Sequence, residues 1–136
     1  KAAESGLLVI ASLPTPDVTT TAGHMIAMLP DAEREIGRMR LAESMRAILA
    51  QQLLPRQGGE GRVAAMEILT ASPEARAALR DPAKLGELAA VMGRADGMQT
   101  FAEHLAELVS SGVVAPETAQ AAGYDTPPPR GKKGRG

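Results

Sequence analysis

The chain has 136 residues, the size of one ordinary domain, and its 44% hydrophobic and 23% charged residues are typical of a globular protein. It contains no cysteine and no tryptophan, and its only aromatic residues are one phenylalanine and one tyrosine, which excludes disulfides, cysteine-ligated metal sites and binding of single-stranded nucleic acid by aromatic stacking. The net charge is −1, and four basic residues lie after position 129, so the rest of the chain is acidic and does not favour nucleic-acid binding.

The first residues predict the end of a helix followed by a buried strand. Gly6 is placed to end a helix in the left-handed conformation, so residues 1–6 are expected to be the last turns of a helix. Residues 7–13 form a nearly continuous apolar run with two β-branched residues, which is typical of a strand buried on both faces of a parallel sheet. The run is far shorter than the roughly 20 residues of a membrane-spanning helix. We therefore expect no membrane span, and no signal peptide, because no apolar segment follows a basic start.

Two helices are expected next. Thr15 can cap the first, with Pro16 as its first residue, and this helix should end before Pro30. The second and longer helix should begin near Asp31, since the apolar residues between positions 36 and 53 recur mostly every three or four residues.

A β-hairpin is predicted at residues 52–69. The glycine-rich turn at 57–61 separates two apolar segments, and Pro55 indicates that the first strand is an edge there. Alternation in the second strand places Val63, Ala65 and Glu67 on one face and Ala64, Met66 and Ile68 on the other.

The rest of the chain predicts four helices and a tail. The helices are expected at residues 73–80, 82–93 and 98–111, with a short one from about 116. Ser72 and Asp81, each followed by proline, are placed to cap the first two. The third should bury a stripe that begins at Phe101 and should end at Gly112. The residues from 125 onward are rich in proline, glycine and basic residues and predict a disordered tail.

No arrangement of residues in the sequence predicts a catalytic or metal site. His24 and His104 are the only histidines, and each stands alone on its predicted helix, so a structural or surface role is favoured over metal binding. No nucleophile elbow occurs. The only Gly-Lys pair, Gly131-Lys132, is followed by Lys133 and is not a phosphate-binding loop.

Five segments, in order and at similar spacing, resemble the C-terminal half of the type IV pilus retraction ATPases, the PilT-like branch of the secretion ATPase superfamily. The first, Ala-Ala-Glu-Ser-Gly-Leu-Leu-Val and the residues up to Thr15, is similar to the family's His box. The others lie at residues 41–47, 61–69, 74–81 and 112–117. The resemblance is nearly collinear over residues 2–122.

The chain departs from the family at defined positions. The two histidines of the box fall on Leu7 and Pro14, and Thr15 closes the box. The resemblance assigns the sensing of the γ-phosphate to the second histidine, and Pro14 has no hydrogen-bond donor, so that contact is lost.

Residues 74–81 resemble the motif that distinguishes the retraction ATPases. Arg76 and Arg80 are retained unchanged, and Asp81 replaces a glutamate. The two arginines are one turn apart on one helix face, where the family has a functional surface. The other interpretation is a capped surface helix with solvated arginines.

The resemblance implies an α/β fold in three parts. Residues 1–71 are expected to be the C-terminal part of a RecA-like ATPase core with few strands and a hairpin, residues 72–125 a helical subdomain, and residues 126–136 a disordered basic tail. It further implies a hexameric ring in which hydrolysis of ATP with Mg²⁺ drives pilus disassembly and twitching motility. Such a ring is cytoplasmic, and its partners are the pilus machinery proteins at the inner membrane.

Alternatives to an active motor part remain open. The phosphate loop and the acidic motifs of the family lie upstream of these residues, so we expect no cofactor on this chain alone. A non-enzymatic module that joins or blocks the ring of a complete motor is the second hypothesis, and the replacement of both histidines favours it. Nucleic-acid binding by the basic tail is a weaker third one, since four flexible charges give only salt-sensitive attachment.

Overall fold

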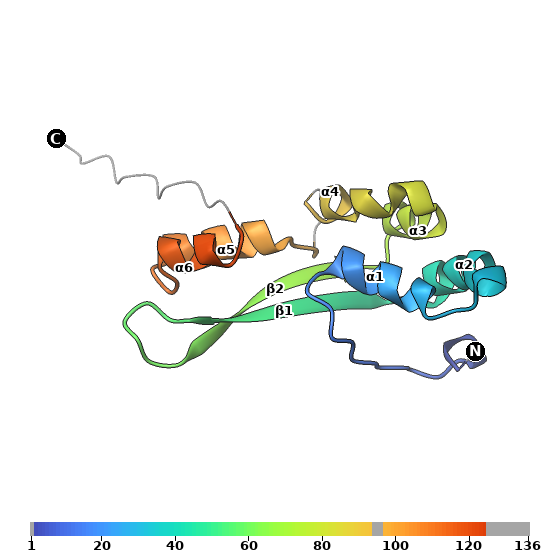
Figure 1. Ribbon diagram of the computed structural model, residues 1–136, viewed down its shortest axis with the longest axis horizontal. Coiled ribbons are helices and arrows are strands. Elements are labelled where there is room, and N and C mark those ends of the chain that lie inside the picture. Colours follow the sequence, from blue (N-terminus) through green and yellow to red (C-terminus); the bar gives the residue numbers. More distant parts are fainter. Residues whose placement is uncertain (1, 94–96, 125–136) are drawn as a thin grey trace.

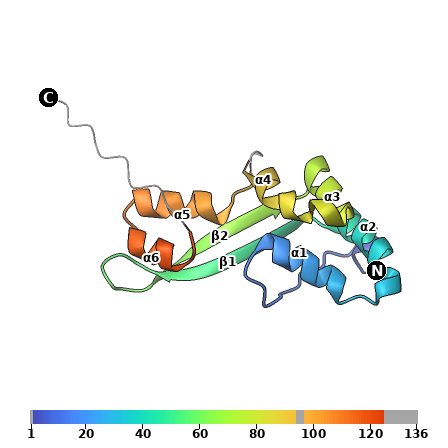
Figure 2. The same ribbon diagram turned by 45° about the horizontal axis from the view of Figure 1, so that its top comes forward.

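The computed structural model describes residues 2–93 and 97–124. A long two-stranded antiparallel hairpin forms its base, with strand β1 at Ala47–Pro55 and strand β2 at Arg62–Thr70. The strands pair without interruption from Ala47 opposite Thr70 to Pro55 opposite Arg62. Helices lie along one side of this hairpin (Figures 1 and 2). The predicted hairpin and the mixed helix and strand class are confirmed.

Helix α2 (Arg34–Ser44) is shorter than the helix predicted from residue 31 onward, and that prediction was wrong beyond residue 44. A 3-10 turn, η2 (Asp31–Glu33), precedes it, and β1 begins three residues after it. Along β1, buried residues such as Ile48, Ala50 and Leu54 follow the period of two of a strand. Pairing with β2 therefore overrides the helix-like spacing of the apolar residues.

The predicted strand at residues 7–13 is not formed, and this prediction was wrong. These residues form no ladder with any other described residue, and Leu8 and Ile10 are 83% and 87% exposed. A strand needs a neighbouring backbone to accept and donate its hydrogen bonds, and the described sheet contains only β1 and β2. At the start of this segment, a 3-10 turn, η1 (Ala3–Ser5), ends at Gly6 in the left-handed conformation, as predicted (φ 85°).

Helix α1 (Val18–Ala27) begins two residues later than predicted. Its cap is Asp17, whose carboxylate accepts a hydrogen bond from the Thr20 backbone N–H at 2.7 Å. Thr15, the predicted cap, instead hydrogen bonds through its hydroxyl to the Thr21 hydroxyl at 2.6 Å. Proline at position 16 can occupy the extended segment before the helix as well as its first turn, which explains the shifted start.

The C-terminal helices follow their predicted order. Ser72 caps α3 (Pro73–Arg80), Asp81 caps the 3-10 turn η3 (Pro82–Glu87), and Thr100 forms a capping box at the start of α5 (Phe101–Ser110). Helix α4 (Leu88–Met92) follows η3, and α6 (Pro116–Ala121) is the last element. The tail predicted at residues 126–136 lies outside the described residues, and the division into two parts at residue 72 stays a prediction.

The core lies between the inner face of the hairpin and the helices. Its largest fully buried side chains come from β2 and from α1, α3, α4, α5 and the segment before α6; they are Leu69, Val18, Leu79, Leu88, Met92, Phe101, Leu105 and Val114. Across residues 2–93 and 97–124, no helix is long and apolar enough to cross a membrane.

Candidate functional site

The His-box positions lie on the extended segment before α1. Leu7 is 64% exposed and Pro14 is also exposed, and neither side chain has a hydrogen-bond donor. Thr15 is partly buried by its hydroxyl bond to Thr21. This segment therefore offers a phosphate no donor from the side chains of Leu7 or Pro14.

Arg76 and Arg80 on α3 bind the end of α2. The Arg76 guanidinium donates to the backbone carbonyls of Ala42 and Glu43, the latter at 2.7 Å, and Arg80 forms an ion pair with the Glu43 carboxylate. The last carbonyls of a helix have no partner within the helix, and a cation is favoured there by the helix dipole. Arg76 thus caps α2 and joins it to α3.

Asp81 has a different role from the two arginines. It ends α3, and its carboxylate accepts from the Ala83 backbone N–H at 2.9 Å, which caps η3. The hydrogen bonds given for the box positions stay within the N-terminal part, whereas those of the arginines reach α2, so no such bond joins the two predicted sets in the described chain. The expected contact of the arginines with a neighbouring subunit stays a prediction.

A buried carboxylate on β2, Glu67, was not predicted as a site. It is 7% exposed, and its Oε2 accepts a hydrogen bond of 2.8 Å from the backbone N–H of Val18. Burial raises the pKa of Glu67 above its ordinary value, the bond from Val18 opposes this, the nearby charge of Asp17 adds to it, and a weaker hydrogen bond from the Phe101 backbone opposes it. The signal in the sequence was one acidic residue on the strand face that also contains Val63 and Ala65.

His104 and Gln99 bind the outer edge of β2. The Ile68 N–H donates to the Gln99 carbonyl at 2.8 Å and the Gln99 N–H donates back at 3.1 Å, which forms one bridge beside the hairpin. His104 Nδ1 accepts from the Met66 N–H at 2.9 Å. A structural role for His104 is therefore supported. Within the described residues, no group of three or more acidic or histidine side chains is placed to hold a metal ion.

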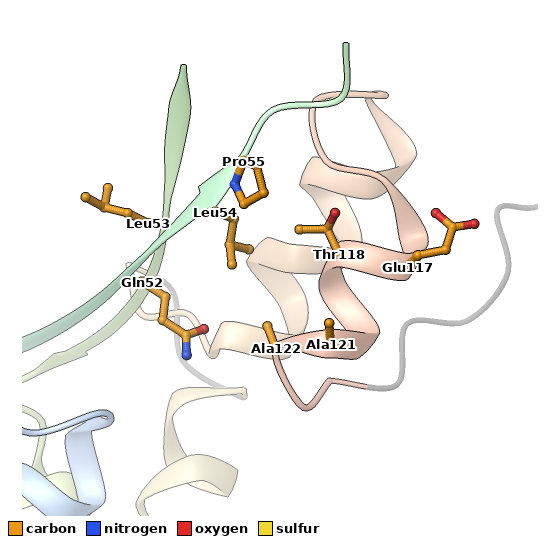
Figure 3. Close-up of a pocket in the computed structure, with 8 residues that line it drawn as sticks. All are labelled: Gln52, Leu53, Leu54, Pro55, Glu117, Thr118, Ala121 and Ala122. Atoms are coloured by element: carbon orange, nitrogen blue, oxygen red, sulfur yellow. The ribbon is translucent and has the colours of Figure 1, made fainter. Parts of the chain in front are cut away.

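A pocket of about 520 Å³ lies between the end of β1 and α6 (Figure 3). It is open and mostly apolar, and its lining residues are Gln52, Leu53, Leu54, Pro55, Glu117, Thr118, Ala121 and Ala122. The Oε1 atom of Gln52 is buried without a hydrogen-bond partner among the described residues. The only ionisable lining residue is Glu117, so the lining has no pair of groups for acid–base chemistry.

Comparisons with known proteins place this geometry in a family. No protein-family model matches the chain. It is 40% identical over 121 residues to a twitching motility protein of Neisseria gonorrhoeae and 34% identical over 120 residues to the type IV pilus retraction ATPase PilT of Pseudomonas aeruginosa. Each match covers 88% of this chain but only 32% and 35% of the relatives, so the chain spans about a third of their length.

The fold gives the same result. The chain superposes on the crystal structure of the pilus retraction motor PilT with bound ADP with a TM-score of 0.72 and 30% identity, over 83% of this chain and 31% of that one. The chain is therefore a relative of the PilT-like pilus retraction ATPases and corresponds to the C-terminal part of their fold.

Proposed function

We propose that this chain acts as the C-terminal part of a type IV pilus retraction motor subunit. In the complete protein, ATP hydrolysis in a hexameric ring at the cytoplasmic face of the inner membrane would drive pilus disassembly through the pilus machinery. The observation that supports this most strongly is the match of 88% of the chain to proteins named for twitching motility and pilus retraction.

Within such a motor, the described residues serve coupling rather than nucleotide binding. Pro14 has neither a side-chain donor nor a backbone N–H, and Leu7 is apolar, so these positions do not fit a phosphate group. Nor do the described residues contain an acidic cluster that fits Mg²⁺. ATP and Mg²⁺ would be held by other parts of the ring, and we assign no step of the hydrolysis to this chain.

A second function, an interaction module that regulates a complete motor, is favoured by the same two residues. A module that only joins a ring has no need of phosphate-sensing histidines, and Leu7 and Pro14 stand where the family has them. The exposed position of both residues leaves this segment accessible to a partner.

A chimera separates the two functions. Residues 2–124 replace the matching third of the gonococcal twitching motility protein, once as they stand and once with Leu7→His and Pro14→His, and twitching and ATP hydrolysis are measured. If the chain is a motor part, the variant with both histidines hydrolyses ATP and supports twitching, and the unmodified chimera does so less well. If both chimeras assemble and neither supports twitching, the motor proposal is contradicted and the regulatory module is favoured.

A further inference from the structure

One buried carboxyl group lies where two helices begin. Glu67 is the only buried ionisable side chain in the described part of the chain. The N-terminal ends of α1 and α5 lie next to each other over β2 (Figures 1 and 2). These helices come from the two predicted parts of the chain, 1–71 and 72–125.

The contacts of Glu67 are complementary to those of the helix caps. The first N–H groups of a helix have no acceptor within the helix. In α1 the cap Asp17 serves the Thr20 N–H, and in α5 the cap Thr100 serves the Glu103 N–H at 3.2 Å. The N–H of the first residue of each helix is left over. Glu67 accepts from both of these, at 2.8 Å from Val18 and more weakly from Phe101.

The surroundings contain few other charges. Asp17, at the start of α1, and Tyr124, after α6, interact with Glu67 electrostatically. The Tyr124 ring lies 5.7 Å from the Phe101 ring, so it closes the site on the side of α5. Helix α4, which also packs on β2, has only apolar residues, and His104 of α5 is bonded to the backbone of β2. A carboxyl group in this setting depends on the two helix N–H groups for its hydrogen bonds.

We infer that Glu67 is a positioning residue, which fixes the start of α1, and with it the preceding Pro14 and Thr15, relative to the start of α5. The link to motor function rests on the proposed function. There, Glu67 holds the segment at the position of the His box in register with the C-terminal helices. A displacement of that segment then moves α5, because a backbone N–H of each helix binds the same carboxyl group.

The link can be measured directly in the 136-residue chain by NMR. The backbone amide signals of Val18 and Phe101 are followed as the pH is raised from acidic to neutral. Both are expected to shift with one common midpoint that lies above the ordinary glutamate value of 4.5. Glu67→Gln should abolish the shared transition at both sites.

Two control variants remove carboxylates that lie beside the helix starts. Asp17→Asn and Glu103→Gln should leave the shared midpoint in place, since neither residue bridges the helices. Different midpoints at Val18 and Phe101, or a shared transition that persists in Glu67→Gln, would overturn the inference. If Glu67→Gln does not fold, the wild-type midpoints and the two controls decide by themselves.

The consequence for motion is tested in the active chimera with both histidines. Glu67→Gln should retain ATP hydrolysis within about twofold, which corresponds to less than about 0.5 kcal/mol, and should lose twitching. Equal loss of both activities would contradict a coupling role. If the chimera without this substitution is inactive, the proposed function fails, whereas the NMR result on the Glu67 link still stands.

Discussion

Arg76 and Arg80 are one turn apart on α3 but make bonds of different kinds. Arg76 binds two backbone carbonyls at the end of α2, whereas Arg80 makes an ion pair on the exposed surface. Backbone carbonyls at a helix end are fixed in place, so a cation that binds them loses less entropy than one that pairs with a mobile side chain. The two residues therefore differ in their expected contribution to stability.

For Arg76→Ala we expect the free energy of unfolding to fall by about 1 kcal/mol, because a charge-assisted bond to the helix end is lost. Arg80→Ala, the matched control, should change it by less than about 0.5 kcal/mol, as is usual for exposed ion pairs. Urea unfolding of both variants checks this. Equal losses would show that Arg76 does not cap α2.

Glu67 gives a dependence of stability on pH with a defined sign. Its pKa is raised in the fold, mainly by burial, above the ordinary value of 4.5. Between these two values the folded chain binds a proton that the unfolded chain has lost, so the contribution of Glu67 to stability is complete below 4.5 and falls as the pH rises through the raised pKa.

Relative to Glu67→Gln, the wild-type chain should therefore lose free energy of unfolding as the pH is raised from acidic to neutral. Denaturant unfolding of both proteins at a series of pH values measures this difference. A difference that stays constant or grows in favour of the wild type would rule out the raised pKa.

At the scale of elements, local signals predicted well and long-range ones did not. Ser72 and Asp81 were identified as caps from their own residue types and neighbours, and the hairpin from its alternation and its glycines. Residues 45–53 satisfied both the helix and the strand period, and only pairing with β2 decides between them. The site at Glu67 escaped prediction because its partner Val18 is 49 residues away in the sequence.

The apolar segment at residues 7–10 has a consequence for solubility. Together with Leu49 and Leu53 on the outer face of β1, it leaves large apolar side chains in water. Short uncharged apolar segments of this kind pair with exposed strand edges of other molecules. The isolated chain should therefore self-associate as its concentration rises.

Leu8→Lys with Ile10→Lys should reduce this association, because two charges would be buried on pairing. Sedimentation velocity over a range of concentrations measures it. Ala89→Lys with Ala90→Lys on α4 adds the same charge at exposed positions elsewhere and should leave the association unchanged. A wild-type chain that stays monomeric at high concentration would contradict this prediction.

At the scale of the molecule, the described residues form a hairpin, a helical cover and the bonds that join them. Arg76 connects α3 to α2, and Glu67 connects β2 to α1 and α5. All these bonds cross between the predicted core part and the predicted helical subdomain, or join elements beside that division. This is the arrangement expected of a part that transmits motion within a larger subunit, and it contains no site that fits a nucleotide.

The central claim is that this chain is a coupling part and not a nucleotide site, and titration calorimetry of the chain with Mg-ATP tests it most directly. We expect no saturable heat of binding, because the sequence has no phosphate loop and Pro14 has no hydrogen-bond donor. A saturable site with micromolar affinity for Mg-ATP would contradict the account.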